Sequence, residues 1–451
     1  MKSLFKSHTK LIVAILLPTL AFGTNEVTRQ IEEIVQVIHQ NQTSFPDKDF
    51  NVIDFGAVGD GKHDDLPAIQ EAIDTCSLSG GGRVVLPDGI YYLRGPIHFK
   101  SNVNLHLKNG SEIRFSAIPE DFLPPVLTRW ECTELFNYSP FIYAYQCSNI
   151  AITGSGLING NVGETFAKWR PNQKPDQLAL REMGDREIPL HNRVFGGGHW
   201  LRPSFIQTFG CNRVLIEGVK IIDSPFWIVH PVYSNYIIVR GVHIESMRLN
   251  NDGVDPDSCS YVLIEDCTFR TGDDAVAIKS GRDTEGRNIG VPSENIVIRN
   301  NRLLDVHNGL AIGSEMSGSV RNVFMENNTV EKGRNLLYFK SNLDRGGIIE
   351  NVHVRNIEVE QAEIALIRFQ TNYHSYRGGN FPPIFRHFRI NNVSCGKAEH
   401  GIWAEGHEEA PLQDIMIQNT IIKNAKTPLK IGPNDEVLLQ HVTINGKTFE
   451  S

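Results

Sequence analysis

The sequence has no apolar stretch long enough to cross a membrane. The apolar segment at residues 11–17 is stopped by Pro18, and no later segment reaches the roughly 20 residues that a spanning helix needs. The chain is therefore not expected to be an integral membrane protein built from helices.

Cysteines are few and lack the spacing of a metal site. The sequence contains 7 cysteines and no Cys-x-x-Cys pair. An odd number argues against a complete disulfide framework, so buried thiols are expected. Cys259 and Cys267 are close enough in sequence to pair, but nothing requires that they do.

An excess of positive charge is also missing, because the formal net charge is −8. An acidic chain does not have the composition of a nucleic-acid-binding protein. Its overall field does not attract an acidic polymer either, so such a substrate must be held by local Arg and Lys side chains.

The N-terminus has the pattern of a secretory signal peptide. Lys2, Lys6 and Lys10 give a positive start, residues 11–17 are apolar, and Ala21-Phe22-Gly23 offers a small-residue cleavage site. We expect residues 1–23 to be removed and the protein to be exported, either to a periplasm or out of the cell. An uncleaved membrane anchor is the alternative. Residues 24–48 then form a leader with apolar residues at helical spacing.

From about residue 100 onward one phrase recurs, in which a polar residue, often Asn, precedes an apolar-x-apolar triplet. In successive copies the first apolar position falls at 214, 237, 262, 296, 323, 352, 388, 415 and 437. Short strands repeated at such intervals are typical of a solenoid. Leucine-rich repeats are excluded because regular leucines and intervening helices are missing.

The repeat predicts an all-β fold, a right-handed parallel β-helix, with residues 49–451 as one domain behind a short helical cap. A β-sandwich of antiparallel hairpins is the alternative. Asparagines before the strands suit turns and are expected to form ladders between coils. The coils are longest at 161–200, 281–293 and 371–385, and the surplus is expected to form loops that wall a binding cleft.

Two acidic clusters lie about one coil apart. Asp252 precedes Asp273 by 21 positions and Asp274 by 22. Neighbouring coils are about 4.8 Å apart, so the three carboxylates are expected to be close together. Such a cluster must bind a cation, share protons or do chemistry, unless it is merely a row of solvated turns. His307 and Lys340 follow at further intervals of 33 residues and are expected to stack on the same face.

These segments resemble the polygalacturonase family, glycoside hydrolase family 28, over residues 50 to 440. The resemblance is carried by Asn251-Asp252-Gly253, Gly272-Asp273-Asp274, and the run from His307 through Gly313-Ser314-Glu315. Asn251 stands where the family has Thr, and Asn308 where it has Gly. The resemblance implies an inverting hydrolase of pectic chains that needs no cofactor and no metal.

The resemblance also assigns roles. Asp273 would be the general acid, with its pKa raised by its neighbours, and Asp252 and Asp274 would activate water. His307 would help set the protonation of the acid. The substrate-binding residues would be Asn251, Arg282, Arg287, Glu315, Tyr338 and Lys340.

One departure concerns specificity. The family's Arg-Ile-Lys reads Tyr338-Phe339-Lys340 here, and Tyr does not replace a bidentate Arg. The partner is expected to be a galacturonate-containing pectic polysaccharide or oligosaccharide, bound by a monomer and cut from one chain end. A rhamnogalacturonan, with a neutral sugar after the cleaved bond, is the alternative. A Ca²⁺-dependent pectate lyase and a non-catalytic carbohydrate-binding solenoid also remain open.

Overall fold

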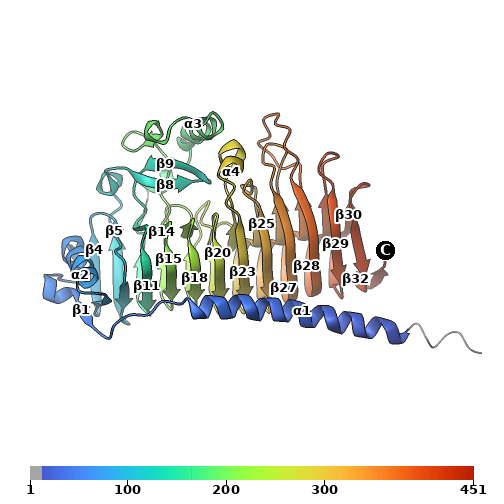
Figure 1. The fold of residues 1–451 in the computed structure, drawn as a ribbon, viewed down its shortest axis with the longest axis horizontal. Helices are drawn as coiled ribbons and strands as arrows, with labels where there is room; N and C mark the ends of the chain where they lie inside the picture. The colour runs from blue at the N-terminus through green and yellow to red at the C-terminus, as the bar shows by residue number, and fades with distance from the viewer. Residues whose placement is uncertain (1–12, 164) are drawn as a thin grey trace, which may run out of the picture.

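The chain forms a right-handed parallel β-helix whose coils lie side by side along one axis (Figure 1). The computed structural model describes residues 13–163 and 165–451. Each coil contributes strands to three faces. The first face contains β1 (Asp49–Asn51), β3 (Gly82–Leu86), β6 (Val103–Leu107), β11 (Ser148–Gly154), β15 (Asn212–Glu217), β18 (Asn235–Arg240), β20 (Ser260–Glu265), β23 (Ser293–Arg299), β25 (Val320–Glu326), β29 (Leu412–Gln418) and β31 (Val437–Gln440).

The second face contains β2 (Asp60–Asp64), β4 (Gly89–Leu93), β7 (Ser111–Phe115), β12 (Leu157–Asn159), β16 (Lys220–Ile222), β19 (His243–Ser246), β21 (Thr268–Thr271) and β32 (Val442–Ile444). The third contains β5 (Ile97–His98), β10 (Ile142–Tyr145), β14 (Ile206–Phe209), β17 (Val229–Val232) and β22 (Val276–Ile278). Long strands bend from face to face, namely β24 (Arg302–Ile312), β26 (Thr329–Lys340), β27 (Ile348–Gln370), β28 (Ile384–Glu405) and β30 (Ile421–Ile431). β33 (Lys447–Phe449) pairs antiparallel with β32.

The recurrent apolar positions set the register of the first face. Val214 pairs with Ile237, Ile237 with Val262, and Val262 with Ile296. The same in-register pairing continues along the positions named above up to residues 415 and 437. These side chains are apolar because they point into the interior, where those from 237 to 415 are fully buried.

Asparagine ladders form as expected. Asn295, Asn322 and Asn351 all have left-handed φ values, of 57°, 55° and 55°. The amide of Asn322 donates to Asn295 at 2.9 Å, and that of Asn351 donates to Asn322 at 2.6 Å. Asn tolerates this backbone conformation better than most residues, and the stacked amides satisfy one another. The turn before the first face is therefore specified by residue type.

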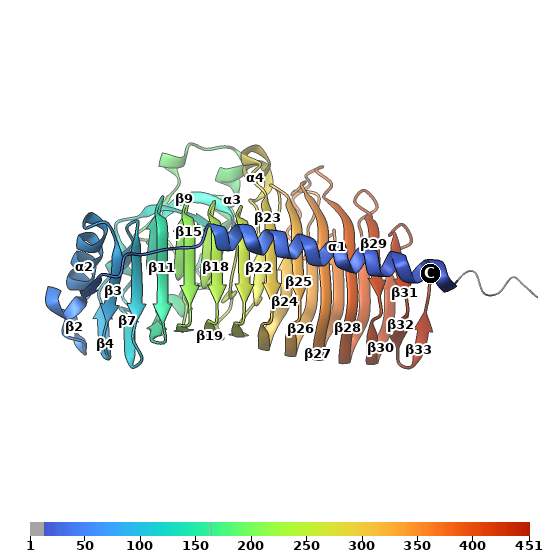
Figure 2. The same ribbon diagram turned by 60° about the horizontal axis from the view of Figure 1, so that its bottom comes forward.

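Helix α1 (Val13–Gln40) lies along the first face (Figure 2). Ile31, Ile34, Val35 and Ile38 pack on residues of four successive coils, which are Ile238, Leu263, Val297 and Phe324. The expected leader helix is thus present up to Gln40. Of the expected signal peptide, residues 1–12 lie outside the described residues. Among the described helices, none combines the length and the apolar character that a bilayer span requires.

The other helices are short and occupy the cap and the insertions. They are η1 (Val52–Phe55), α2 (Leu66–Leu78), η2 (Pro119–Phe122), η3 (Phe166–Trp169), α3 (Gln173–Asp185), η4 (Leu190–Asn192) and α4 (Asp283–Ile289). A small second sheet is formed by β8 (Val126–Trp130), β9 (Thr133–Asn137) and β13 (Val194–Phe195). α3, α4, β8 and β9 lie on the side of the β-helix opposite α1 (Figure 1).

Three of these insertions are joined by buried ion pairs. The guanidinium of Arg181 on α3 contacts Asp283 of α4 at 2.6 Å and Asp344 at 3.0 Å. It also donates to the carbonyl of Ser375 at 2.8 Å. We call α3, α4 and segments 341–347 and 371–379 the loop wall. The three long-coil regions therefore gather in one place, as expected from their surplus length. All seven cysteines are free and buried, so Cys259 and Cys267 do not pair.

Candidate active site

Three carboxylates meet where the second face bends into the third. The amide of Gly253 donates to the carbonyl of Asp274 at 2.9 Å, so Asp252 and Asp274 are neighbours on adjacent coils. One oxygen from each of Asp252, Asp273 and Asp274 lies within 4.8 Å of the others. The sequence spacing of one coil thus brings the two clusters together.

The carboxylates lie in a cleft with a volume of about 700 Å³ between the third face and the loop wall. Glu131, Arg170 and Lys174 line it on the side of the insertions, and Tyr338, Arg368 and Gln370 on the side of later coils. A volume of this order accommodates a small oligosaccharide.

Asp273 is the most accessible of the three carboxylates, and its side chain is 20% exposed. His307 Nδ1 lies 3.1 Å from Asp273 Oδ1. Burial pushes the pKa of Asp273 upward, but the contact with His307, aided by Lys340 and Lys279, leaves this pKa below its usual value. The expectation of a raised pKa at Asp273 is therefore wrong for the free site, because the imidazole and the two lysines together outweigh the effect of burial.

Asp252 and Asp274 are shifted in the opposite direction. Burial raises the pKa of Asp252 well above its usual value, and the neighbouring Asp255 raises it further. Asp255 is itself fully buried, and neither of its carboxylate oxygens has a hydrogen-bond partner among the described residues. Burial likewise raises the pKa of Asp274, against the opposing charge of Lys340. A proton in this cluster therefore resides most readily on the buried carboxylates.

Asp274 is held in place from two sides. The amide of Asn308 donates to Asp274 Oδ1, and Lys340 Nζ lies 3.6 Å from Asp274 Oδ2. Asn335, one coil further on, donates to Asn308 at 2.6 Å. The asparagine that replaces the family's glycine at 308 thus orients a carboxylate of the site.

Lys340 reaches the site by a different route from the one expected. β24 pairs with β26 so that Asn308 lies opposite Asn335, and Val306 opposite Gly333. The coil neighbour of His307 is therefore Arg334, so the expectation that the interval of 33 residues from His307 to Lys340 is one coil is wrong. The backbone of Lys340 lies further along the third face, and its long side chain extends back to Asp274.

A second buried charge network supports the floor of the cleft. Lys279 Nζ donates to the carbonyl of Gly313 at 2.9 Å and lies 3.4 Å from Glu315. Glu315 also faces Arg345 at 3.7 Å. Although burial alone would raise the pKa of Glu315, these cations hold it far below its usual value. Glu315 lines the cleft, but its charge is already neutralised by protein cations.

The remaining predicted binding residues occupy different surroundings. Arg282 lines the cleft and is paired with Glu131 at 2.6 Å. Arg287 is not among the lining residues; its guanidinium stacks on Phe381 at 3.5 Å within the loop region. Asn251 is fully buried and donates to the carbonyls of Ser224 and Phe226, so it shapes the turn that presents Asp252.

Tyr338 lies in the cleft wall as expected. Its hydroxyl donates to Gln370 at 2.5 Å, and burial raises its pKa to about 12. Arg368, from the next coil, lies over its ring at 4.6 Å. Three residues of the site, Asp255, Lys279 and Arg368, were not predicted from the sequence. The one available signal was the position of Lys279, five residues after Asp274 in a matching motif.

The three aspartates also form a candidate cation site, which is the arrangement a Ca²⁺-dependent lyase needs. Ca²⁺ takes six to eight oxygen ligands, whereas three carboxylates converge here. Lys340 and Lys279 face the same carboxylates and oppose a second cation. The donor set therefore fits proton transfer better than binding of a divalent ion.

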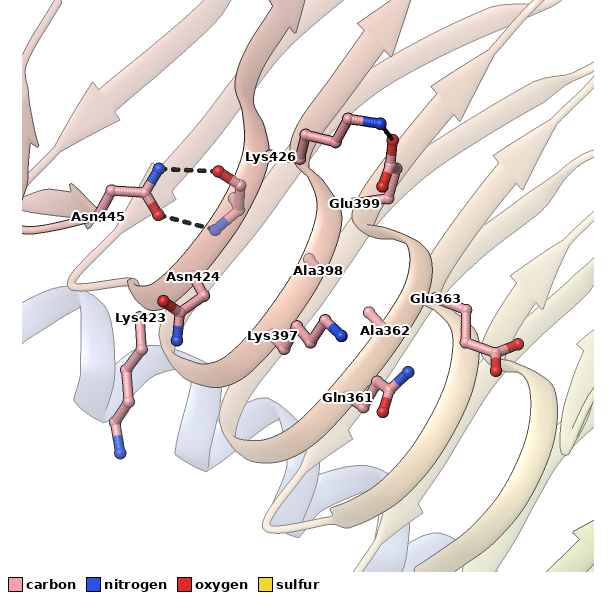
Figure 3. A pocket seen from close by; sticks show the side chains of 11 residues that line it. Gln361, Ala362, Glu363, Lys397, Ala398, Glu399, Lys423, Asn424, Lys426 and Asn445 are labelled. Carbon is pink, nitrogen blue, oxygen red and sulfur yellow. Dashed lines mark hydrogen bonds and ion pairs between the residues drawn. The ribbon is translucent and has the colours of Figure 1, made fainter.

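A second hollow of about 740 Å³ lies on the last coils (Figure 3). It is lined by Lys397, Lys423 and Lys426, of which Lys426 is paired with Glu399 at 2.9 Å. Asn445 holds the backbone of Ala425 across its edge with two hydrogen bonds of 2.7 Å. This hollow contains no cluster of carboxylates and gives no sign of acid–base chemistry.

Comparison with known proteins agrees with the motifs. Residues 101–401 match the model of glycosyl hydrolases family 28, and residues 50–106 match one described as rhamnogalacturonase A/epimerase, pectate lyase-like. The solved structure of a hyperthermoactive exopolygalacturonase from Thermotoga maritima is 42% identical. It superimposes with a TM-score of 0.89, over 93% of this chain and 97% of that one.

Curated relatives are more distant. A probable polygalacturonase from Vitis vinifera is 26% identical over 95% of this chain and 84% of its own length. An exo-poly-α-D-galacturonosidase from Dickeya chrysanthemi is 24% identical over 89% of this chain and 75% of its own length. The chain therefore belongs to glycosyl hydrolases family 28 and is a glycoside hydrolase, which sets aside the lyase and the non-catalytic alternatives.

Proposed function

We propose that this enzyme hydrolyses α-galacturonosyl linkages in pectin-derived chains, acting from a chain end and inverting the anomeric carbon. One observation carries the substrate assignment. The cleft is lined by Arg170, Arg334 and Arg368, none of which has a salt-bridge partner among the described residues. Unpaired cations around a floor of carboxylates suit a polyanionic sugar chain. The names of the similar proteins support the same substrate class.

In the proposed reaction, Asp273 is the general acid. It is the most accessible carboxyl and donates its proton to the glycosidic oxygen as the bond to the anomeric carbon breaks. A water held by Asp252 and Asp274 loses its proton to one of these carboxylates, and its oxygen bonds to the anomeric carbon. The products are a shortened chain and a free sugar with a new hemiacetal.

Asp273 must be protonated for this step, whereas its pKa is lowered in the free site. A bound uronate chain changes this balance in two ways. It excludes water from the cleft and brings its own negative charge, and both effects raise the pKa of a carboxyl. Substrate binding therefore favours transfer of a proton to Asp273 from the buried carboxylates.

Two geometric observations bear on the stereochemistry. One carboxylate oxygen from each of Asp252, Asp273 and Asp274 lies within 4.8 Å of the others. This separation resembles the distance of about 5 Å between the two catalytic carboxyl groups of retaining enzymes. However, Asp252 and Asp274 are only 4% and 1% exposed, so neither has an open approach to an anomeric carbon. Carboxylates recessed in this way suit the activation of water, and the family resemblance also implies inversion.

Chain-end action is supported by the loop wall. Arg181 ties α3 to α4 and to segment 371–379, and the hairpin β8–β9 joins them because the amide of Glu134 donates to Glu285 at 2.8 Å. Elements from distant coils are thus fixed together beside the cleft, and in this proposal the wall closes one end of it. A polymer that cannot pass the wall must enter by its end.

Export and domain organisation belong to the same proposal. We expect cleavage after Gly23, leaving leader residues 24–48 and one catalytic domain, 49–451, as a monomer. The packing of Ile31, Ile34, Val35 and Ile38 on the β-helix supports a leader that stays with the catalytic domain. Sequencing the N-terminus of exported protein tests this boundary.

The alternative substrate is a rhamnogalacturonan, favoured by Tyr338 in place of an arginine. Digesting polygalacturonan and rhamnogalacturonan in parallel separates the two. We expect polygalacturonan to release monomeric galacturonate from the first minutes, with little loss of viscosity. Proton NMR of the first product should show the β-anomer. Larger first products would contradict chain-end action, an α-anomer would contradict inversion, and turnover of rhamnogalacturonan alone would contradict the substrate assignment.

A further inference from the structure

The guanidinium of Arg368 lies between two aromatic rings from the neighbouring coils. Its central carbon is 4.6 Å from the ring centroid of Tyr338 and 4.2 Å from that of Trp403. The three residues occupy the same position on β26, β27 and β28, since Tyr338 pairs with Arg368 and Arg368 with Trp403. The stacking of coils therefore creates the sandwich.

Both rings are anchored by hydrogen bonds. The Tyr338 hydroxyl donates to Gln370 at 2.5 Å, and the Trp403 indole N–H donates to Glu405 at 2.7 Å. A planar cation held between two anchored rings keeps one orientation, with its N–H groups along its edge. This arrangement reduces the entropy that Arg368 would lose on binding a ligand.

Arg368 forms no salt bridge among the described residues. Glu405 interacts with it only at longer range, since burial acts to raise the pKa of Glu405 and the charge of Arg368 contributes to lowering it. Its only hydrogen bond there is a donation from Nη2 to Gln370 at 3.1 Å, and its buried Nε has none. The other cation of this part of the wall, Lys340, already faces Asp274 at 3.6 Å. Arg368 lines the cleft one coil beyond Tyr338 and Lys340. Among the described residues it is thus an oriented guanidinium without an ion-pair contact, in the cleft that holds the reacting groups.

We propose that Arg368 binds the carboxylate of the sugar that follows the cleaved bond, and so makes the enzyme select a uronate at that position. This inference rests on the proposed hydrolysis of galacturonosyl linkages. A guanidinium edge donates two parallel hydrogen bonds to a planar carboxylate, whereas a methyl ester or a neutral sugar offers no charge. Arg368 supplies from the next coil the arginine that is missing at position 338. Trp403 is a positioning residue that holds the guanidinium.

The test uses digalacturonate and the same disaccharide methyl-esterified only at its reducing-end carboxyl. The measurement is the ratio of kcat/KM for the acid to kcat/KM for the ester. We expect wild-type enzyme to prefer the acid by roughly 10- to 100-fold, the usual value of a charge-assisted pair. In Arg368→Met the ratio should fall toward one, and Arg368→Lys should retain part of it.

Lys397→Met is the matched control, because Lys397 is an exposed cation with no salt bridge to any residue that the structure describes, and it lies in the second hollow, outside the cleft. Its ratio should equal that of wild type. Trp403→Leu should raise KM for the acid more than it lowers kcat. Thermal unfolding of each variant identifies any loss of fold.

A folded Arg368→Met variant that keeps the wild-type ratio would overturn the inference, even if its overall rate fell. So would a wild-type enzyme that cleaves both disaccharides equally well. A wild-type enzyme that cleaves neither contradicts the proposed function itself, and the inference falls with it.

Discussion

Nδ1 of His307 lies 3.1 Å from Oδ1 of Asp273, and this contact gives the most accessible carboxylate of the site a lowered pKa. The two buried carboxylates, Asp252 and Asp274, have raised pKa values instead. Proton occupancy in the free enzyme is therefore the reverse of what the reaction needs. Each of the first four predictions changes one partner of this arrangement.

Removing the imidazole should raise the pKa of Asp273, because the hydrogen bond and the charge of His307 lower it. In His307→Ala, Asp273 should keep its proton to a higher pH. The alkaline limb of the kcat profile should therefore move to higher pH, while kcat itself falls. His63→Ala, at an exposed position on β2, is the control. An unmoved alkaline limb would show that another group limits the rate there.

Replacing Lys340 should act on the other limb. Lys340 opposes the raised pKa of Asp274, so Lys340→Met should raise that pKa further. If ionised Asp274 is needed to activate water, the acid limb of kcat/KM should move to higher pH. Lys397→Met, remote from the cleft, should leave the profile unchanged. A shift toward lower pH would exclude Asp274 from the water-activating pair.

Neutralising Asp255 should move the same acid limb of kcat/KM in the opposite direction, to lower pH. It is buried beside Asp252 and raises the pKa of that residue. In Asp255→Asn, which keeps the size of the side chain, Asp252 should remain ionised to a lower pH. The acid limb of kcat/KM should then move downward. If the limb stays in place while the protein melts at its usual temperature, Asp252 is not the group that titrates there.

Loss of the general acid should reduce the rate without abolishing binding. Asp273→Asn should lower kcat by about 10²- to 10⁴-fold, the usual contribution of a positioned acid. Calorimetric titration with trigalacturonate should still show binding. Asp266→Asn, at an exposed turn, serves as the matched change. Rates near those of wild type in Asp273→Asn would refute the assignment of the acid.

The asparagine ladder gives a prediction about stability. Asn322 has a φ of 55° and hydrogen bonds to both Asn295 and Asn351. Asn322→Ala loses these bonds and adds left-handed strain, so it should destabilise by about 2 kcal/mol. Asn322→Gly loses only the bonds and should cost less. A denaturant series compares the two, and equal midpoints would mean that backbone strain contributes nothing.

Much of the fold follows from local pattern. The apolar positions from 214 to 437 pair with one another in the structure as they recur in the sequence, because one inward-facing residue per coil sets the register. The spacing of Asp252 and Asp274 was informative for the same reason. Cross-coil neighbours in a solenoid are separated by one repeat, which a sequence displays directly.

Other features depend on contacts that no repeat encodes. β24 and β26 pair at a constant offset of 27 residues (Asn308 opposite Asn335), so Arg334, and not Lys340, is the neighbour of His307. The pKa order of the aspartates depends on burial and on the direction in which the imidazole points. Arg368 carries no motif, since its environment comes from the side chains of the two adjacent coils.

Helix α1 has a consequence for the cooperativity of unfolding. A solenoid behaves as a one-dimensional array, in which each coil contacts only its neighbours and can open without disturbing distant ones. α1 contacts β18, β20, β23 and β25 at once through one apolar stripe. Opening any of these coils must also release the helix from the other three. The central coils, which hold Asp252, Asp273 and Asp274, are thereby coupled into a single unit that opens together, and hydrogen exchange there should report one common opening free energy.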